Sequence, residues 1–310
     1  MGSVIGSPSK DKRTRSASEI ARSDSDVVTT LQYIDVQLGD KIAEGGQGVV
    51  YKGKYNGKDV AVKYYELGSQ FPDVAEKIAK DLRREVSIMT TCYHSHVVRA
   101  LGTTAVRPKI DGKTFEAALV LEYFNGQSLS HIYGPEDERT KAAKDFTIGD
   151  CLGALFHVGK GILYLHDCKI IHRDIKPGNI LLEFDASGRF VRGAIADFGI
   201  SKYNDPNEKQ TRYRGTGKYR APEVSSANYD HRVDIYSLGF VILRCVVEGG
   251  HTPGIDKGVL MSNRVLAGLG KLKDCAILCL SDDPKARPTL IAVLQRLEKD
   301  YIRLASKPRI

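Results

Sequence analysis

Residues 171–182 read Ile-His-Arg-Asp-Ile-Lys-Pro-Gly-Asn-Ile-Leu-Leu, a polar loop between two apolar, strand-like ends. The loop carries a carboxylate (Asp174), an ammonium (Lys176) and a carboxamide (Asn179) within six positions. Phosphoryl transfer needs these groups: an acceptor for the hydroxyl proton, a positive charge near the moving phosphate and an oxygen ligand for magnesium. The stretch therefore predicts a phosphoryl-transfer site.

A second carboxylate follows a short apolar run in Ile195-Ala196-Asp197-Phe198-Gly199. A lone Asp in a loop usually caps a turn, but two such loops in this order and spacing are a rarer pattern. Together they resemble the catalytic loop and the Asp-Phe-Gly loop of eukaryotic protein kinases. The resemblance implies a bilobal α+β fold, with a small β-rich N-lobe carrying one main helix and a larger helical C-lobe.

The composition agrees with an intracellular globular chain. Its 310 residues are 42% hydrophobic and 27% charged, enough for one large domain or two lobes with a substantial core. No run of 18 apolar residues and no secretory signal occurs, so we expect a cytoplasmic or nuclear protein. The net charge of +8 is dispersed along the chain, and no direct nucleic-acid binding is expected. The six cysteines are scattered and mostly flanked by apolar residues, which favours reduced core thiols.

Residues 1–30 are rich in Ser, Lys, Arg and Asp, and they predict a disordered tail. Gly2 after Met1 suggests myristoylation, although Gly6 occupies the position where that motif has Ser or Thr. Membrane association is therefore expected only if Gly2 is modified.

Residues 42–51 predict a strand, a glycine-rich turn and a second strand. Glycines let backbone amides approach a phosphate closely, so such a turn can close over a nucleotide triphosphate. The family's first glycine is replaced here by Ala43, while Gly45 and Gly48 match the second and third. An Asn-Gly hairpin turn then leads into residues 60–63, a strand that ends at Lys63.

Residues 73–92 show apolar side chains at helical spacing, with Glu85 on the same segment. The resemblance implies that Glu85 holds the Lys63 ammonium against the α- and β-phosphates. Residues 97–105 and 114–123 predict two strands, and the second runs into an extended link. That link resembles the kinase hinge, with Leu121 as gatekeeper and the backbone groups of Glu122 and Phe124 binding adenine. The implied ATP pocket comprises Ile42, Ala43, Gly45, Gly46, Gly48, Val50, Ala61, Lys63, Leu121, Glu122, Phe124 and Leu181.

The segment from Asp197 to Ala221-Pro222-Glu223 corresponds to the family's activation segment. Thr211 and Tyr213 are candidate phosphorylation sites, and Arg173 would be free to pair with a phosphate there. Thr216 resembles the Ser/Thr-kinase residue whose hydroxyl bonds the catalytic Asp and Lys.

Three further residues have structural roles implied by the family. Asp234, opening a strongly apolar helix, anchors the catalytic-loop backbone, and Arg287 pairs with Glu223 inside the C-lobe. The domains expected are a tail at 1–30, the N-lobe at 31–123, the hinge and C-lobe at 124–303 and a short tail at 304–310. The long apolar helix at 151–166 and a closing helix at 290–303 belong to the C-lobe.

The motifs therefore predict an ATP-dependent protein Ser/Thr kinase that acts in phosphorylation-based signalling. Residues 48–63 and 279–289 are most similar to the tyrosine-kinase-like group. In the mechanism implied, Asp174 accepts the acceptor proton, Lys176 steadies the γ-phosphate, and Asn179 and Asp197 hold magnesium, or manganese in its place. Expected partners are protein substrates with Ser or Thr acceptors and an activating kinase, either upstream or a second copy acting in trans.

Two alternatives stay open. A pseudokinase scaffold would use the fold for binding alone. Such proteins usually lack one or more catalytic residues, whereas here Ala43 is the one position that departs from the family pattern. A small-molecule kinase would lack the Ala-Pro-Glu element at 221–223 and the Gly-Thr loop at 215–216. Kinases that select Arg three residues before the acceptor often have Glu at the position of Gly178 and another near Ser128. Both acids are missing here, so strong selection of that kind is not expected.

Overall fold

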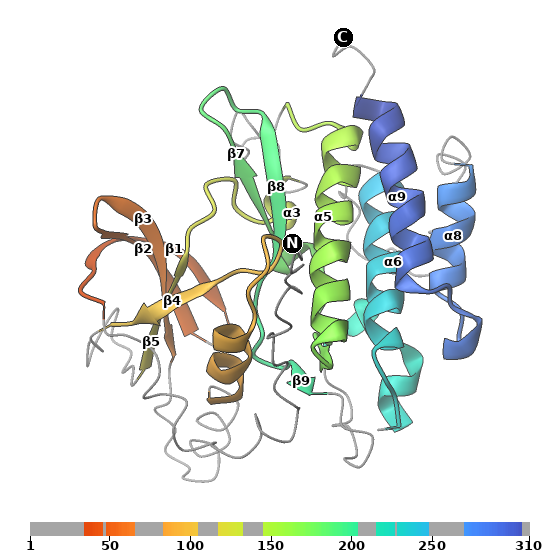
Figure 1. Ribbon diagram of the computed structural model, residues 1–310, viewed down its shortest axis with the longest axis horizontal. Coiled ribbons are helices and arrows are strands. Elements are labelled where there is room, and N and C mark those ends of the chain that lie inside the picture. Colours follow the sequence, from red (N-terminus) through yellow and green to blue (C-terminus); the bar gives the residue numbers. More distant parts are fainter. Residues whose placement is uncertain are drawn as a thin grey trace, which may run out of the picture.

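The computed structural model describes residues 34–45, 48–65, 83–104, 117–132, 145–203, 215–226, 228–247 and 270–305. Within these ranges a twisted sheet and a helical body lie side by side, and the chain crosses between them after β5 (Figure 1). The bilobal α+β arrangement expected from the sequence is confirmed. The glycine-rich loop tip, the activation-segment centre and both predicted tails fall wholly or largely outside the described residues.

The N-lobe is built on a five-stranded antiparallel sheet in the order β1-β2-β3-β5-β4. Its strands are β1 (Gln37–Gly45), β2 (Gly48–Tyr55), β3 (Lys58–Tyr65), β4 (Ala100–Thr103) and β5 (Ala117–Glu122). Asn56 and Gly57 turn the chain between β2 and β3 with φ of 48° and 75°. These left-handed conformations are what a tight two-residue hairpin requires, which explains the Asn-Gly pair.

One helix accompanies the sheet, and the structure describes it from residue 83 to residue 91. Its buried side chains Val86, Ile88 and Met89 join a core that continues into the C-lobe and includes Phe198. The predicted beginning of this helix at Asp73 lies outside the described residues.

The C-lobe consists of helices packed beside a two-stranded hairpin (Figure 1). Its helices are α3 (Leu129–Ile132), α5 (Ile148–Asp167), α6 (Arg232–Val247), α8 (Lys271–Cys279) and α9 (Leu290–Ala305). The strands are β6 (Ile170–Ile171), β7 (Ile180–Phe184), β8 (Phe190–Ile195) and β9 (Lys202–Tyr203), with single turns η3 (Pro177–Asn179), η4 (Gly217–Tyr219), η5 (Pro222–Ser226) and η7 (Pro284–Ala286). Helix α5 packs against α9 on one side and β8 on the other. Because β6 and β7 flank residues 172–179, the catalytic loop is held between two buried strands.

The structure differs from the sequence-based expectations at three places. The strand expected over 97–105 is reduced to β4 because Val97 makes only an isolated parallel bridge to Ile195 in the other lobe. Helix α5 begins at Ile148, before the expected residue 151, because Thr147 and Asp150 form a capping box. Cys168 is an exposed thiol, since it ends α5 where the chain turns.

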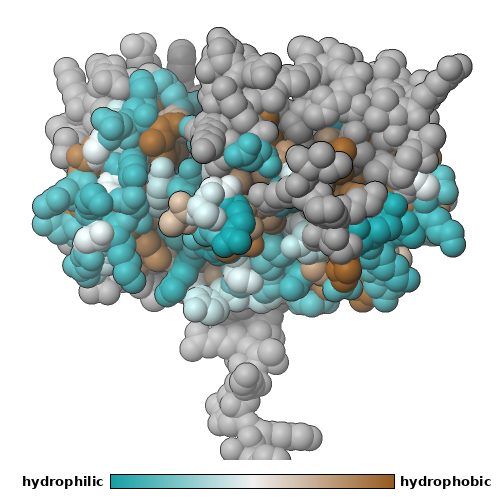
Figure 2. All heavy atoms as spheres, turned by 90° about the horizontal axis from the view of Figure 1, so that it is seen from above, coloured by the Kyte–Doolittle hydropathy of each residue, from teal (hydrophilic) through white to brown (hydrophobic). Residues whose placement is uncertain are grey.

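Helix α5 is the one described helix whose length and apolar composition would suffice to cross a membrane. It is instead the central helix of the C-lobe, and 61% of its most apolar stretch is buried inside the protein. On the face shown in Figure 2, hydrophilic side chains predominate among the coloured residues and hydrophobic ones form small separate groups. Scattered exposed apolar residues of this kind are normal on globular proteins.

Candidate active site

The carboxylate of Asp174 is the centre of the site. One oxygen, Oδ1, accepts hydrogen bonds from the Thr216 hydroxyl at 2.6 Å and the Thr216 amide at 3.0 Å. The other, Oδ2, accepts from Lys176 Nζ at 2.6 Å and from Asn179 Nδ2 at 3.0 Å. The Lys176 ammonium also donates to Thr216 Oγ1 at 2.9 Å. The structure thus brings together four residues that the sequence placed in one site, and their hydrogen bonds fix the orientation of the carboxylate.

The backbone under this carboxylate is held by Asp234 from α6. Its two oxygens accept hydrogen bonds from the amides of His172 at 2.9 Å and Arg173 at 2.8 Å, and His166 Nε2 lies 2.8 Å away. Burial alone would raise the pKa of Asp234, but the His166 interaction and the Arg173 amide outweigh it and lower the pKa. Arg173 has a left-handed φ of 68°, a conformation that costs about 1–3 kcal/mol and persists only when its surroundings enforce it. The hydrogen bonds to Asp234 supply that enforcement.

Lys63 joins three segments that are distant in sequence. Its ammonium, at the inner end of β3, lies 2.9 Å from Glu85 Oε1 on the 83–91 helix and 3.2 Å from Asp197 Oδ1 after β8. Burial opposes the charge on Lys63, but the two carboxylates raise its pKa well above the usual value and keep it a cation. A fixed cation here is suited to hold phosphate oxygens.

Asn179 and Asp197 offer oxygen atoms that suit a hard divalent cation. The Asn179 amide nitrogen donates to the Asp174 carboxylate and backbone carbonyl, which leaves the amide oxygen as its ligand atom. Burial would raise the pKa of Asp197, but Lys63 lowers it, so this carboxylate stays ionised. In the described part of the chain no group of three or more His, Cys, Asp or Glu side chains forms a metal cage. Magnesium fits such a sparse set, because it usually takes one or two protein ligands and completes its shell with phosphates and water.

Residues expected to line the adenine site lie on facing strands and beside the hinge. Ala61 of β3 pairs with Leu121 of β5, and Leu181 of β7 bridges to Ser128 just beyond the hinge. Ala61 is buried and Leu121 is half-buried. The two apolar side chains from the sheet therefore lie next to the link that joins the lobes.

The other residues expected around the nucleotide lie on the glycine-rich hairpin. Ile42 is 42% exposed, Ala43 pairs with Val50, and Gly45 pairs with Gly48, while Gly46 lies outside the described residues. Gly48 has φ of 139°, and a Cβ there would lie 1.9 Å from the backbone oxygen of Tyr64. Only glycine fits this position without moving β3. Ala43 lies in β1 directly after an irregularity in the β1–β2 register between Lys41 and Ala43.

Arg192 is a site-supporting residue that sequence reasoning missed. From β8 its guanidinium reaches Glu122 at 2.8 Å, Glu183 at 2.5 Å and the carbonyl oxygen of Ser95 at 2.7 Å. It also covers the ring of Phe124, with its central carbon 4.6 Å from the ring centroid. The Arg192 cluster ties the hinge to β7 and to the loop before β4. No motif marks it, since its partners are spread over almost ninety positions.

Glu223 and Arg287 form the expected internal pair. Arg287 Nη1 and Nη2 lie 2.5 and 2.8 Å from the two carboxylate oxygens, and the arginine side chain is 0% exposed. Arg287 also donates to the carbonyl oxygens of Ser281 and Arg232, and it covers the ring of Tyr236. The pair fixes η5 against the segment before α9.

The structure describes only the two ends of the expected activation segment. Thr211 and Tyr213 lie outside the described residues. Arg173, expected to be free for a phosphate, donates from Nε to the Ile200 carbonyl at 2.6 Å and from Nη1 to Tyr229 Oη at 3.2 Å. The Arg173 side chain is therefore already hydrogen-bonded in this structure, so the expectation that it is free is not met.

These elements define a bilobal enzyme fold with a phosphoryl-transfer site between its lobes. Comparison with known proteins gives the family: residues 36–302 match the protein kinase domain, and the chain belongs to that family. It is 31% identical over 90% of its length to the RGS domain-containing serine/threonine-protein kinase A of Dictyostelium discoideum. It is 38% identical over 66% of its length to the proline-rich receptor-like protein kinase PERK13 of Arabidopsis thaliana. The matches cover 24% and 27% of those relatives, so the chain corresponds to about a quarter of each.

Proposed function

We propose that this chain is an ATP-dependent protein Ser/Thr kinase that uses magnesium to transfer the γ-phosphoryl group to a hydroxyl. The observation that carries the proposal is the hydrogen bond between the Thr216 hydroxyl and Asp174 Oδ1 at 2.6 Å, beside the Lys176 ammonium. The site thus already accommodates an aliphatic hydroxyl at the carboxylate. The relatives described as Ser/Thr kinases support the same acceptor class.

Each residue then has a role that its contacts allow. Asp174 orients the acceptor hydroxyl and receives its proton, and Lys176 neutralises charge on the transferred group. Lys63, fixed by Glu85, holds the α- and β-phosphates. Asn179 and Asp197 would hold magnesium, which neutralises negative charge on the phosphates when bound.

The test is transfer of labelled phosphate from ATP to a generic protein substrate, followed by phosphoamino-acid analysis. The wild type should label Ser or Thr in a magnesium-dependent reaction. Asp174→Asn should keep ATP binding and lose transfer by about 100-fold or more, the scale of a positioned acid–base group. Lys63→Met should weaken both ATP binding and phosphoryl transfer. Lys58, an exposed lysine at the first position of β3, provides the matched control, and Lys58→Ala should behave as wild type. Transfer that survives in Asp174→Asn would overturn the proposed role.

Regulation by activation-segment phosphorylation is a finer part of the proposal. Its support is the position of Arg173 beside Asp174 and of Lys202 on β9, which pairs with β6 directly before the loop. Phosphate placed on Thr211, or on Tyr213, would add negative charge near these cations and order the segment. Mass spectrometry after incubation with ATP, and kcat for Thr211→Ala beside Tyr213→Phe, test this step. Equal kcat in all three proteins, with the wild type phosphorylated, would contradict it.

Activation and cellular location complete the proposed function. Activation would come from an upstream kinase or from a second copy in trans, and the protein would act in the cytoplasm or nucleus, with membrane attachment only through a modified Gly2. A scaffold that binds ATP without transfer is the competing function. The scaffold function would be supported only if the wild type binds ATP and transfers no phosphate after activation-segment phosphorylation.

A further inference from the structure

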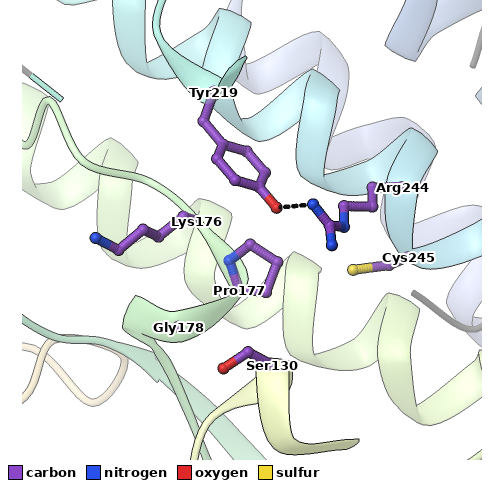
Figure 3. Close-up of a pocket in the computed structure, with 7 residues that line it drawn as sticks. All are labelled: Ser130, Lys176, Pro177, Gly178, Tyr219, Arg244 and Cys245. Carbon is purple, nitrogen blue, oxygen red and sulfur yellow. Dashed lines mark hydrogen bonds between the residues drawn. The ribbon is translucent and has the colours of Figure 1, made fainter. Parts of the chain in front are cut away.

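A cavity of about 140 Å³ lies beside the catalytic loop (Figure 3). Its walls come from the loop itself (Lys176, Pro177 and Gly178), from η4 (Tyr219) and from α6 (Arg244 and Cys245). Cavities of about 150 Å³ can hold a molecule the size of benzene, so a side-chain carboxylate or phosphate group fits.

The cavity has a cationic wall. Arg244 Nη1 donates to Tyr219 Oη at 2.7 Å, and Figure 3 shows the guanidinium pointing from α6 toward Pro177. The ammonium of Lys176 points the other way in Figure 3 and is used by Asp174 and Thr216. Among the described residues, the contacts of the Arg244 guanidinium are with Tyr219, whose hydroxyl and ring are both uncharged. A guanidinium has five N–H donors, so one bond to a neutral phenol leaves donors for an oxyanion.

A second cation lies near Arg244, and the residues that line the cavity include no acid. Lys218, next to Tyr219, has a lowered pKa because of partial burial and the nearby charge of Arg244. Gly178 contributes no side chain to the wall. Ser128 bonds through its hydroxyl to Ser130, another lining residue, at 2.7 Å. The residues that line the cavity therefore include no acid, and Arg244 places a cation on its wall.

The cavity lies within reach of a peptide bound at Asp174. Lys176 belongs to both places, because its stem lines the cavity while its ammonium lies 2.6 Å from Asp174 Oδ2. An extended peptide advances about 3.3 Å per residue. A side chain about two to four positions from the acceptor hydroxyl can thus enter the cavity.

We propose that the Arg244 cavity is a specificity subsite that selects protein substrates with an anionic side chain, Asp, Glu or a phosphorylated residue, a few positions from the acceptor Ser or Thr. The inference rests on the proposed kinase function and adds the substrate class. Arg244 contacts the substrate anion, and Tyr219 holds the guanidinium in place.

A peptide set with one Ser acceptor tests the subsite. Asp, Glu, phosphoserine, Arg and Ala are placed in turn at each of the four positions on either side, and kcat/KM is measured with the full chain and Mg-ATP. The wild type should prefer an acidic or phosphorylated residue over Ala at one or two neighbouring positions by about 10- to 100-fold, the scale of a hydrogen-bonded charge pair. The phosphoserine and Asp arms show which oxyanion the cavity favours.

Variants identify the cation responsible. Arg244→Ala should remove the preference, and Arg244→Glu should replace it with a preference for Arg at the same position. Tyr219→Phe keeps the guanidinium and should retain a preference for acids. Lys58→Ala, which removes one charge from the far end of β3, should match the wild type. Thermal unfolding with and without ATP shows whether each variant is folded. If Arg244→Glu does not fold, the peptide preferences of the wild type and of Arg244→Ala still test the proposal.

Three results would overturn the subsite. These are equal rates on acidic and neutral peptides, an acid preference that persists in Arg244→Glu, and a preference confined to positions far from the acceptor. The first leaves the proposed kinase function standing, since transfer still occurs. Absence of transfer to every peptide and to the generic protein substrate would remove both.

Discussion

Replacing Glu223 by Gln should lower the thermal stability of the C-lobe sharply. The change keeps the size of the side chain but removes the charge that faces Arg287, whose side chain is 0% exposed. Removing one partner of a buried ion pair costs about 3–5 kcal/mol, because the other charge is left uncompensated. Two backbone carbonyls continue to accept hydrogen bonds from Arg287, so we expect the lower end, about 3 kcal/mol. For a domain of this size each kcal/mol shifts Tm by about 2–4 °C, which gives a fall of about 6–12 °C.

Differential scanning calorimetry at pH 7 is the appropriate measurement, with an exposed ion pair as control. Lys54 is 60% exposed and pairs with Asp59, so Lys54→Gln should change stability by less than about 1 kcal/mol. Added salt should affect the control pair more than the buried one, since buried charges are screened less. In a double-mutant cycle with Arg287→Met, the two changes should cost less together than their sum. A Tm for Glu223→Gln no lower than that of Lys54→Gln would refute the reasoning.

Gly48→Ala should weaken ATP binding in isothermal titration, because its Cβ would collide with the Tyr64 carbonyl 1.9 Å away; unchanged affinity would contradict this geometry. His96 and His157 stack with centroids 4.3 Å apart, and burial lowers the pKa of each to about 4. Between pH 4 and 6.5 the unfolded chain therefore binds more protons than the folded chain, and the free energy of unfolding falls as the pH is lowered. His157→Phe should make this fall smaller, which urea titrations at several pH values would measure. Thr216→Ala should lower kcat by about 10- to 100-fold and Thr216→Ser should restore it; equal rates would show that this hydroxyl does not support Asp174.

The loops that carry the chemistry could be predicted from sequence because their residues are close in the chain. Asp174, Lys176 and Asn179 lie within one turn-like segment, and short apolar runs on both sides predicted β6 and β7. The roles of Glu85 and Thr216 could be predicted only from the family resemblance. Nothing local shows that a helix and a distant loop will approach the catalytic residues.

Features that depend on tertiary contacts were missed or displaced. Arg192 has no sequence signal, because its importance comes from four segments that meet only in the folded chain. The cavity at Arg244 depends on a phenol 25 positions earlier and on the catalytic loop. The start of α5 could have been found, since Thr147 and Asp150 have the spacing of a capping box. Its apolar periodicity alone placed the beginning three residues late.

The Asp234 anchor has a consequence for the order in which the protein matures during its synthesis. The amide of His172 is bound by a carboxylate 62 residues further along the chain. A ribosome adds about 5–20 residues per second, so the catalytic loop is made roughly 3–12 s before its anchor. Until α6 is complete and packed, the Asp234 carboxylate cannot hold the left-handed backbone of Arg173. A nascent chain that ends before Asp234 therefore contains every residue of the catalytic loop and still lacks its working shape.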